Sequence, residues 1–297
     1  MNEPTFRQIR YFVAVAREGQ VSRAAKELNV SQSAVTTAIR QLEEIVGAPL
    51  FDRHAGGMGL TYEGTIFQDH ARRVLSALDE AVRAPNLRRS EVEGALRLAM
   101  TYTVAGYYAS PYLERFIRAF PKVTLQMVEA PREAIEDGLV SGRYDLALML
   151  TSNIANQEGL LYETLLQSRR RLWVGAEHPL LEKPVVTLAD VAQEPYVMLT
   201  VDEASNTAQR YWNHLRARPR IAFRTSSTEA VRSMVGAGMG VTILSDMVYR
   251  PWSLDGRRVD VITLADPIPT MNVGLAWAAN VEHSAAVQAF CEFMHRG

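Results

Sequence analysis

Apolar side chains recur at helical spacing from the beginning of the chain. Over residues 5–18 the apolar stripe runs from Phe6 to Ala16, Thr5 can cap the helix and Gly19 can end it. The pattern predicts an amphipathic first helix that packs across the elements after it.

Residues 21–46, VSRAAKELNVSQSAVTTAIRQLEEIV, predict two helices joined by a tight turn. Asn29 tolerates the left-handed conformation that such a turn needs, and Ser31 is a favourable N-cap for the second helix. The apolar positions of that helix are spaced by four, three and four residues and share one face: Val35, Ile39, Leu42 and Val46.

The opposite face of this second helix is polar. Together with the cap, its residues are Ser31, Gln32, Ser33, Thr36, Thr37 and Arg40. Short hydrogen-bonding side chains suit a helix that enters the major groove of DNA. A surface hairpin with a hydroxyl-rich wet face shows the same periodicity, so the pattern alone leaves both interpretations open.

Two short apolar pairs flank a glycine-rich turn directly after the hairpin. Leu50-Phe51 and Leu60-Thr61 stand on either side of the segment HAGGMG, which predicts a small β-wing. A wing next to a helix pair favours DNA binding, and Arg53 is the basic residue that it offers.

One long amphipathic stretch follows, from Thr61 to about Arg89, with no proline before Pro85. A single helix with one apolar stripe needs a partner to bury that stripe. The partner is either the rest of its own domain or the same helix of a second subunit, and we favour the second subunit.

Strands alternate with helices from Gly94 onward, which predicts an α/β domain with a parallel-type sheet. The strand candidates are ALRLAM, VTLQMV, residues 144–149, RRLWVGA, PYVMLT, RIAFRT, VTILSD, VDVITL and NVGLAWA. The helix candidates are residues 107–120, 134–141, 208–216, 228–236 and 284–295.

Composition adds little to this picture. Hydrophobic residues make up 47% of the 297 residues and the net charge is −1, as in an ordinary globular protein. Residues 1–90 hold 12 Lys and Arg against 10 Asp and Glu, so DNA binding rests on the helix pattern and not on charge. Cys291 is the only cysteine, no secretory signal or membrane-length apolar run is visible, and the pattern predicts a cytoplasmic protein.

The N-terminal segment resembles the DNA-binding domain of LysR-type transcriptional regulators. The matching residues are Phe12, Val15, Ala24, Ala25, Leu28, Val30, 31–35, Ile39, Leu42, Glu43, Gly47, Leu50, Phe51, Arg53, Leu60, Thr61 and Gly64. The rest of the chain resembles the effector-binding domain of that family, on the residues 144–147, Val235, Gly236, Gly238 and Gly240. In the wing the family usually carries a further basic residue, where this chain has Gly56-Gly57-Met58-Gly59.

The resemblance implies a fold and a set of partners. It places an all-α winged helix-turn-helix domain at 1–61, a linker and dimerisation helix with a hinge at 62–91, and an α/β effector-binding domain at 92–297. That domain is similar to periplasmic binding proteins, with one lobe at 92–164 and 268–297 and another at 165–267. The implied partners are double-stranded DNA, a small-molecule effector, further copies of the chain as a dimer or tetramer, and RNA polymerase as a further candidate.

Polar residues follow the ends of several predicted strands, where open α/β sheets bind small molecules. These effector-binding candidates are Thr101, Tyr102, Thr103, Pro131, Arg132, Thr200, Asp202, Ser227, Thr228 and Ser245. The helix start at residues 101–103 and Arg132 favour an anion, and Asp202 favours a nitrogen donor if it faces the cleft. A small polar metabolite with a carboxylate fits this set, although hydroxyl residues at such positions also act as plain helix caps.

No enzyme chemistry emerges from the sequence. The six histidines lack metal-ligand spacing, no G-x-S-x-G motif is present, and we expect no cofactor and no metal. The segment GAGMG follows a predicted helix and precedes a strand, which reverses the order of a dinucleotide-binding loop. The rival interpretation is a solute-binding module or small-molecule enzyme with an unrelated helical domain.

Overall fold

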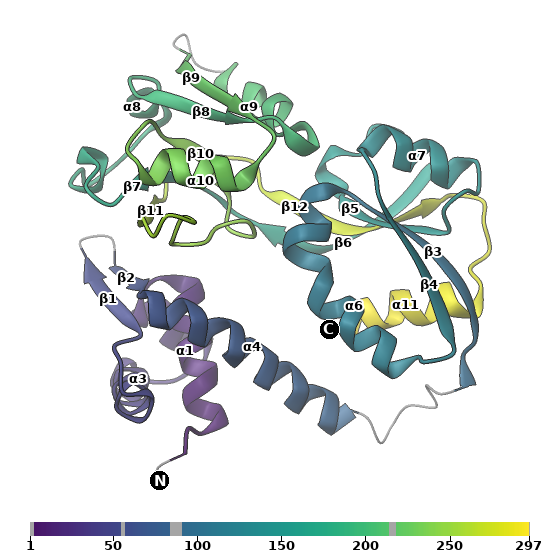
Figure 1. Ribbon diagram of the computed structural model, residues 1–297, viewed down its shortest axis with the longest axis horizontal. Coiled ribbons are helices and arrows are strands. Elements are labelled where there is room, and N and C mark those ends of the chain that lie inside the picture. Colours follow the sequence, from purple (N-terminus) through teal and green to yellow (C-terminus); the bar gives the residue numbers. More distant parts are fainter. Residues whose placement is uncertain (1–2, 55–56, 84–90, 214–217, 297) are drawn as a thin grey trace. The chain divides into compact units, whose positions relative to one another are not determined.

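The computed structural model describes residues 3–54, 57–83, 91–213 and 218–296. Its N-terminal part begins with three helices, α1 (Phe6–Glu18), α2 (Val21–Glu27) and α3 (Gln32–Val46) (Figure 1). Thr5 caps α1 together with Gln8 in a capping box, and Gly19 ends the helix in the left-handed conformation at φ 67°. The amphipathic first helix is therefore confirmed at both ends.

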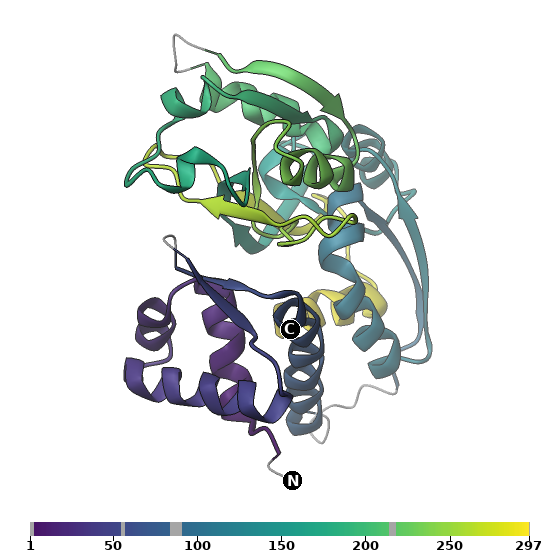
Figure 2. The same ribbon diagram turned by 60° about the vertical axis from the view of Figure 1, so that its left-hand side comes forward.

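The turn between α2 and α3 has the conformation that the sequence predicts. Asn29 is left-handed at φ 54°, and the backbone N–H of Val30 donates to the carbonyl oxygen of Ala25. The Ser31 hydroxyl accepts from the N–H of Ala34 at 3.2 Å and so caps α3. These contacts make a helix-turn-helix with the second helix presented on the outside (Figure 2).

Buried aromatic rings form the centre of this helical part. Phe12 of α1 is fully buried, with its ring centroid 5.1 Å from that of Phe51 and 5.0 Å from that of Phe67. The apolar face of α3 joins the same core, where Val35 and Leu42 are fully buried. Packing against this core holds α3 in place and leaves its other face exposed.

An antiparallel hairpin follows α3, as the sequence predicts. Strand β1 (Phe51–His54) pairs with β2 (Gly57–Leu60), with Phe51 opposite Leu60. The Glu43 carboxylate of α3 accepts from the backbone N–H groups of Leu50 and Phe51 at 2.8 and 3.2 Å. One acidic side chain thus attaches the wing to the helix before it.

The long helix α4 (Tyr62–Arg83) begins where the wing ends. Thr61 caps it by accepting from the N–H of Gly64 at 2.8 Å. A Cβ at Gly64 would lie 2.0 Å from the carbonyl oxygen of Leu50, so only glycine allows this close approach. The predicted helix continues to Arg89, but residues 84–90 lie outside the described ranges.

Five strands form the first lobe of the C-terminal part, in the order β4-β3-β5-β12-β6. Their bounds are β3 (Gly94–Met100), β4 (Val123–Glu129), β5 (Leu146–Leu150), β6 (Leu160–Ser168) and β12 (Met271–Ala278). Helices α6 (Ser110–Ala119) and α11 (Ala285–Arg296) cover one face, and α7 (Arg132–Val140) covers the other (Figure 1). Successive residues of β3 point to opposite faces, so Leu98 belongs to the core under α6 and α11 and Ala99 to the core under α7.

The second lobe contains the remaining strands. Strand β7 (Arg170–Gly175) lies between β10 (Thr242–Ser245) and β11 (Val259–Ile262), and β8 (Pro195–Leu199) runs parallel to β9 (Arg220–Thr225). A bridge between Tyr196 and Val241 joins the two groups. Its helices are α8 (Leu188–Val191), α9 (Ala204–Trp212) and α10 (Thr228–Gly236).

The structure corrects three details of the predicted α/β part. The helix predicted from Tyr107 begins earlier, as α5 (Tyr102–Val104), and reaches α6 through a π-helical turn at Ala105–Ala109. The sheet is mixed, because β12 returns from the second lobe and pairs antiparallel with β5 and β6. Strand β6 escaped prediction because only Leu160 and Ser168, at its two ends, are fully buried, which gives no regular alternation.

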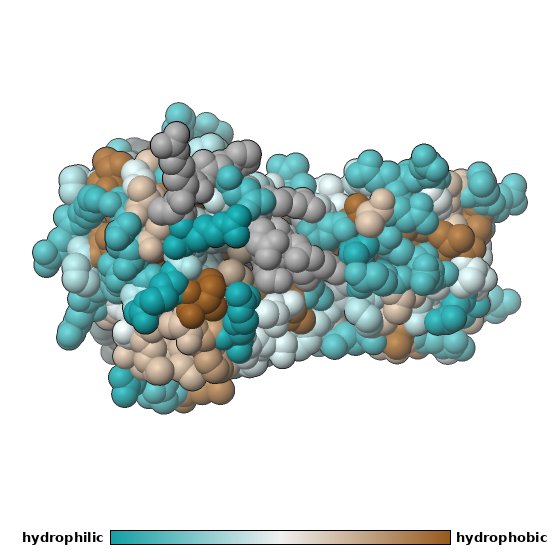
Figure 3. Space-filling model, turned by 90° about the horizontal axis from the view of Figure 1, so that it is seen from above, coloured by the Kyte–Doolittle hydropathy of each residue, from teal (hydrophilic) through white to brown (hydrophobic). Residues whose placement is uncertain are grey.

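The surface of the two lobes is mainly polar on the face seen in Figure 3, where hydrophobic residues form small separate groups. Among the described residues, no helix has both the length and the apolar content needed to cross a membrane.

Candidate functional site

The polar face of α3 is exposed along its whole length. The side chains that the sequence proposes for DNA contact, Ser31, Gln32, Ser33, Thr36, Thr37 and Arg40, are all exposed, while Val35, Ala38, Ile39 and Leu42 between them are buried. A convex, polar helix face with a fixed apolar back is the geometry that major-groove recognition requires.

Contacts within α3 show which of these side chains are bonded to the helix itself and which can turn toward DNA. The Ser31 hydroxyl is used as the cap, and Thr36 donates its hydroxyl to the carbonyl oxygen of Gln32 at 2.9 Å. Arg40 lies 3.5 Å from Glu44, but both side chains are at least 66% exposed, so this ion pair is weak. Arg40 can therefore leave Glu44 for a base or a phosphate. The side chain of Arg53 lies outside the described part of the structure.

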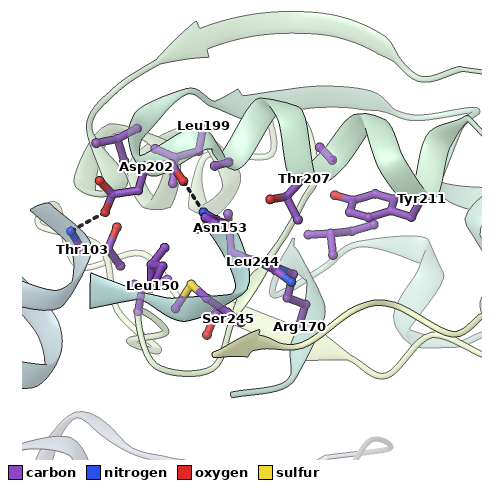
Figure 4. Close-up of a pocket in the computed structure, with 16 residues that line it drawn as sticks. Thr103, Leu150, Asn153, Arg170, Leu199, Asp202, Thr207, Tyr211, Leu244 and Ser245 are labelled. Atoms are coloured by element: carbon purple, nitrogen blue, oxygen red, sulfur yellow. Dashed lines mark hydrogen bonds between the residues drawn. The ribbon is translucent and has the colours of Figure 1, made fainter. Parts of the chain in front are cut away.

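A pocket lies between the two lobes of the C-terminal part (Figure 4). Its volume is about 460 Å³ with the open mouth included, which sets an upper limit for a small ligand. The wall is mostly aliphatic, and its polar side chains are Thr103, Asn153, Arg170, Asp202, Thr207, Tyr211 and Ser245.

Asp202 spans the gap between the lobes. Its carboxylate oxygen Oδ2 accepts from the backbone N–H of Thr103 at 2.7 Å, and its carbonyl oxygen accepts from Nδ2 of Asn153 at 2.9 Å. Asp202 is left-handed at φ 50°, an unusual conformation outside glycine that turns its side chain toward the first lobe. Within the first lobe, Thr103 stands at the helix start where the sequence predicts an anion.

Arg170 and Tyr211 lie on the side of the pocket away from Asp202 and Thr103 (Figure 4). Burial raises the pKa of the Tyr211 phenol well above its usual value, and the neighbouring Tyr196 raises it further. The positive charge of Arg170 acts against both effects. The hydroxyls of Tyr211 and Tyr196 are 3.2 Å apart, so Tyr211 stays a protonated, fixed hydrogen-bonding group.

Ser245 lies where the chain passes between the lobes. Its hydroxyl donates to Oγ of Ser168 at 2.7 Å, and Ser168 also accepts from the N–H of Met247 at 3.0 Å. The crossing strands are thereby held together by two buried serines.

Three of the ten predicted effector-binding residues line this pocket: Thr103, Asp202 and Ser245. The other seven are absent from its lining: Thr101, Tyr102, Pro131, Arg132, Thr200, Ser227 and Thr228. Ser227 caps α10 by accepting from the N–H of Ala230, and Thr101 and Thr228 are almost fully buried. Pro131 is the N-cap residue of α7.

The predicted cation Arg132 pairs with acids of its own helix. Its guanidinium contacts Glu133 and, at 3.0 Å, Glu136. Glu136 is 6% exposed and also accepts from the backbone N–H groups of Ala155 and Asn156, both at 3.0 Å. Arg132 thus neutralises a buried carboxylate that fixes the loop after β5, which is a structural task.

Sequence reasoning missed four polar residues of the pocket: Asn153, Arg170, Thr207 and Tyr211. Arg170 opens the strand candidate RRLWVGA, in a run of three arginines where nothing marks one as special. Thr207 and Tyr211 are four residues apart on α9, and this spacing was the available signal that they share a face.

A second polar contact, between Tyr107 and Glu229, also joins the two lobes. The Tyr107 hydroxyl lies 3.1 Å from Oε1 of Glu229, which also pairs with the buried Arg232. Burial raises the pKa of Tyr107 above its usual value. Both lobes therefore meet through specific polar groups, and their separation would break at least two hydrogen bonds.

Comparisons with known proteins give consistent matches over the whole chain. Residues 6–65 match the family described as bacterial regulatory helix-turn-helix protein, lysR family, and residues 89–297 match the LysR substrate binding domain. The chain is 33% identical to the uncharacterized HTH-type transcriptional regulator YnfL of Escherichia coli, over 96% of this chain and 95% of YnfL. It is 30% identical to the HTH-type transcriptional regulator CysB of Burkholderia cenocepacia, over 87% and 82% of the two chains. Among solved structures, HinK, a LysR family transcriptional regulator from Pseudomonas aeruginosa, matches with a TM-score of 0.64 and 27% identity, over 99% of this chain and 98% of HinK.

Proposed function

The chain belongs to the LysR family of transcriptional regulators, and from this we propose how its two parts work together. It is a DNA-binding regulator with an effector-binding domain, in a family that is not enzymatic. We propose that a small polar metabolite binds in the pocket between the lobes and changes how the DNA-binding parts meet their operator. The observation that carries the proposal is the pocket itself, whose lining comes from both lobes.

The division of the chain follows the sequence prediction. We assign DNA binding to residues 1–61, the linker helix and hinge to 62–91, and effector binding to 92–297. The exposed polar face of α3, with Gln32, Ser33, Thr37 and Arg40, would read base edges in the major groove. Ser31 and Thr36 contribute through the helix itself, because their hydroxyls bond to its backbone.

Lobe closure gives the effector a means of control. A ligand shifts an equilibrium only if it binds one state more tightly than the other. A molecule in contact with Thr103 of one lobe and with Tyr211 of the other gains those contacts together only while the lobes are closed. Effector binding would thus favour the closed state and, through the linker, alter the spacing of two recognition helices.

We further propose that the protein acts as a dimer or tetramer at a near-palindromic operator in the cytoplasm, where the DNA is. A two-fold dimer requires a two-fold site, with half-sites one helical turn apart or a multiple of that. RNA polymerase is the partner through which such a regulator would act on transcription.

The test is a gel-shift titration of the full chain on the DNA flanking its own gene, followed by footprinting. We expect a protected, interrupted near-palindrome and a footprint that changes when the effector is added. The variant Ala204→Trp places a bulky ring in the pocket wall. It should bind the operator like the wild type but lose the effector response, and an unchanged response would place the effector elsewhere.

A further inference from the structure

We propose that Arg170, together with Tyr211, binds the carboxylate of the effector, and that the helix start at Thr103 does not. This inference rests on the proposed function, because it concerns the ligand of the same pocket. It also assigns the opposite side of the pocket, at Asp202, to a hydrogen-bond donor of the ligand.

The helix start already has an anion of its own. The Asp202 carboxylate accepts from the N–H of Thr103 at 2.7 Å and so takes the backbone donor that a ligand carboxylate would need. A ligand anion at this place would have to displace Asp202 and would then lie beside a second negative charge. Like charges at hydrogen-bonding distance repel strongly in a partly buried site. The contact with Asp202 therefore disfavours the helix start as the place for a ligand anion.

The opposite side of the pocket has the complementary charge. Among the described residues that line the pocket, Arg170 is the single cation and Asp202 is the single acid. The Arg170 guanidinium donates to the carbonyl oxygen of Pro269, which fixes its position at the crossing between the lobes. A guanidinium presents five N–H donors in a rigid plane and can bind a carboxylate with two parallel hydrogen bonds.

Tyr211 supports Arg170 at the same side. Its phenol is buried and is held by the hydrogen bond with Tyr196, and the charge of Arg170 acts on both phenols. When the Tyr196 hydroxyl donates to Tyr211, the single phenolic proton of Tyr211 is left to donate to a bound carboxylate, without adding negative charge. Arg170 and Tyr211 together can therefore bind an anion without help from a helix N-terminus.

The pocket wall between Arg170 and Asp202 determines the chemistry of the middle of the ligand. It consists mainly of aliphatic side chains, among them Leu150, Leu199, Ile243 and Met271. The pocket thus fits a hydroxy or amino carboxylic acid with a short apolar body, whose carboxylate faces Arg170 and whose hydroxyl or ammonium group faces Asp202. A dicarboxylate would place its second charge against Asp202 and should bind more weakly.

The test compares matched probes on the full chain by thermal shift and by titration calorimetry. The probes are hydroxy and amino acids of three to seven carbons, from lactate and alanine upward, each with its primary amide and each at the same ionic strength. We expect carboxylates to raise the melting temperature and their amides to fail. If amides bind as tightly as acids, or if no acid in the set binds, the proposal is wrong.

Four variants separate the two possible anion sites. Arg170→Gln should weaken the best carboxylate at least tenfold, and Arg170→Lys should recover part of the affinity. The matched control Arg169→Gln removes the same charge from an exposed neighbour that does not line the pocket, and should bind as the wild type does. Asp202→Ala should weaken the hydroxy and amino acids, because their hydroxyl or ammonium group loses its acceptor, and should not tighten the binding of any carboxylate. Tenfold tighter binding in Asp202→Ala, with unchanged binding in Arg170→Gln, would place the anion at the helix start instead.

The proposed function and this inference fail in different ways. Ala204→Trp should abolish binding of every probe if the pocket is the effector site. A response that survives in Ala204→Trp contradicts the proposed pocket, whereas a response lost in Ala204→Trp but kept in Arg170→Gln contradicts only the role of Arg170. A cooperative urea transition of the C-terminal part like that of the wild type, followed by tryptophan fluorescence, shows that each variant is folded.

Discussion

The Glu43 carboxylate accepts the backbone N–H of Leu50 at 2.8 Å and thereby connects the recognition helix to the wing. The same oxygen accepts from Phe51 at 3.2 Å, and the side chains of Leu50 and Phe51 are buried in the core around Phe12. Glu43 therefore fixes the distance between the two elements that would contact DNA together.

Glu43→Ala should destabilise the N-terminal part by about 1–3 kcal/mol, because two backbone donors lose their acceptor. Glu43→Gln keeps an oxygen in place and should cost less. Trp252 contacts Tyr62 of α4, so the fluorescence is measured in a Trp252→Phe background, where the remaining tryptophans, Trp173, Trp212 and Trp277, report on the C-terminal part. In urea unfolding followed by circular dichroism, the N-terminal part should unfold at a lower urea concentration. The transition seen by tryptophan fluorescence should stay unchanged. A shift in both transitions would contradict a local role.

A second prediction concerns the acid stability of the first lobe. The Asp145 carboxylate accepts from the backbone N–H of Arg97 at 2.8 Å and from its Nε at 3.0 Å. Burial alone raises the pKa of Asp145, but the hydrogen bonds and charge of Arg97 outweigh burial, so the net pKa lies below its usual value. Because the folded pKa is the lower one, Asp145 stabilises the fold fully above its unfolded pKa of about 3.9, and this is lost as the pH falls through the folded pKa.

Asp145→Asn should therefore cost roughly 1 kcal/mol at pH 7, a modest value because the Arg97 side chain is 43% exposed. The difference from the wild type should shrink as the pH falls below about 4. Urea titrations followed by tryptophan fluorescence at several pH values measure this directly. An Asp145→Asn deficit that stays constant down to the lowest pH would show that ionisation of Asp145 does not matter.

The sequence was sufficient for features that depend on neighbouring residues. The left-handed Asn29, the Ser31 cap and the bounds of α10 at residues 228–236 follow from periodicity and capping rules, and all three are confirmed. Local chemistry of this kind is readable because its partners lie within one or two turns of helix.

The pocket could be located only in part, because its contacts are distant in sequence. Thr103 and Asp202 are 99 residues apart, and no local pattern says that the carboxylate of one bonds to the N–H of the other. Arg132 was assigned to an anionic ligand, although Glu136 lies at the helical i+4 spacing where an ion pair is expected. The i+4 spacing alone therefore predicts that Arg132 pairs with Glu136 and not with a ligand.

The recognition helix gives a third prediction. Arg40→Ala and Thr37→Ala should each cost about 1–3 kcal/mol in operator binding and should relax preference at one base position. Glu44→Ala is the matched control, because it removes the ion-pair partner of Arg40 from the same helix. It should leave affinity unchanged or slightly higher, since it also removes a negative charge near the phosphates. Unchanged affinity and selectivity in Arg40→Ala would show that another face of α3 meets the DNA.

The last prediction concerns the two faces of α4. Phe67, Ala71 and Leu75 pack against the core of the N-terminal part. On a neighbouring stripe, Tyr62, Ile66 and Val74 are 59%, 46% and 41% exposed. The spacing of four and eight residues places them on one side of the helix. The Tyr62 ring meets the edge of Trp252, with the centroids 6.4 Å apart, whereas Ile66 and Val74 are absent from the buried core around Phe12.

An exposed apolar stripe on a long helix is well covered by the same stripe of a second copy, because a two-fold axis repeats each apolar contact and so buries the stripes of both copies. Ile66→Asp and Val74→Asp should therefore weaken dimerisation at least tenfold in sedimentation velocity, and should weaken operator binding in parallel. Val185→Asp is the control, because Val185 is 57% exposed but does not belong to α4. The thermal unfolding of dilute protein should change little, since both side chains are exposed in a single chain. Dimers that persist in the Ile66→Asp, Val74→Asp double variant would assign subunit contact to another surface.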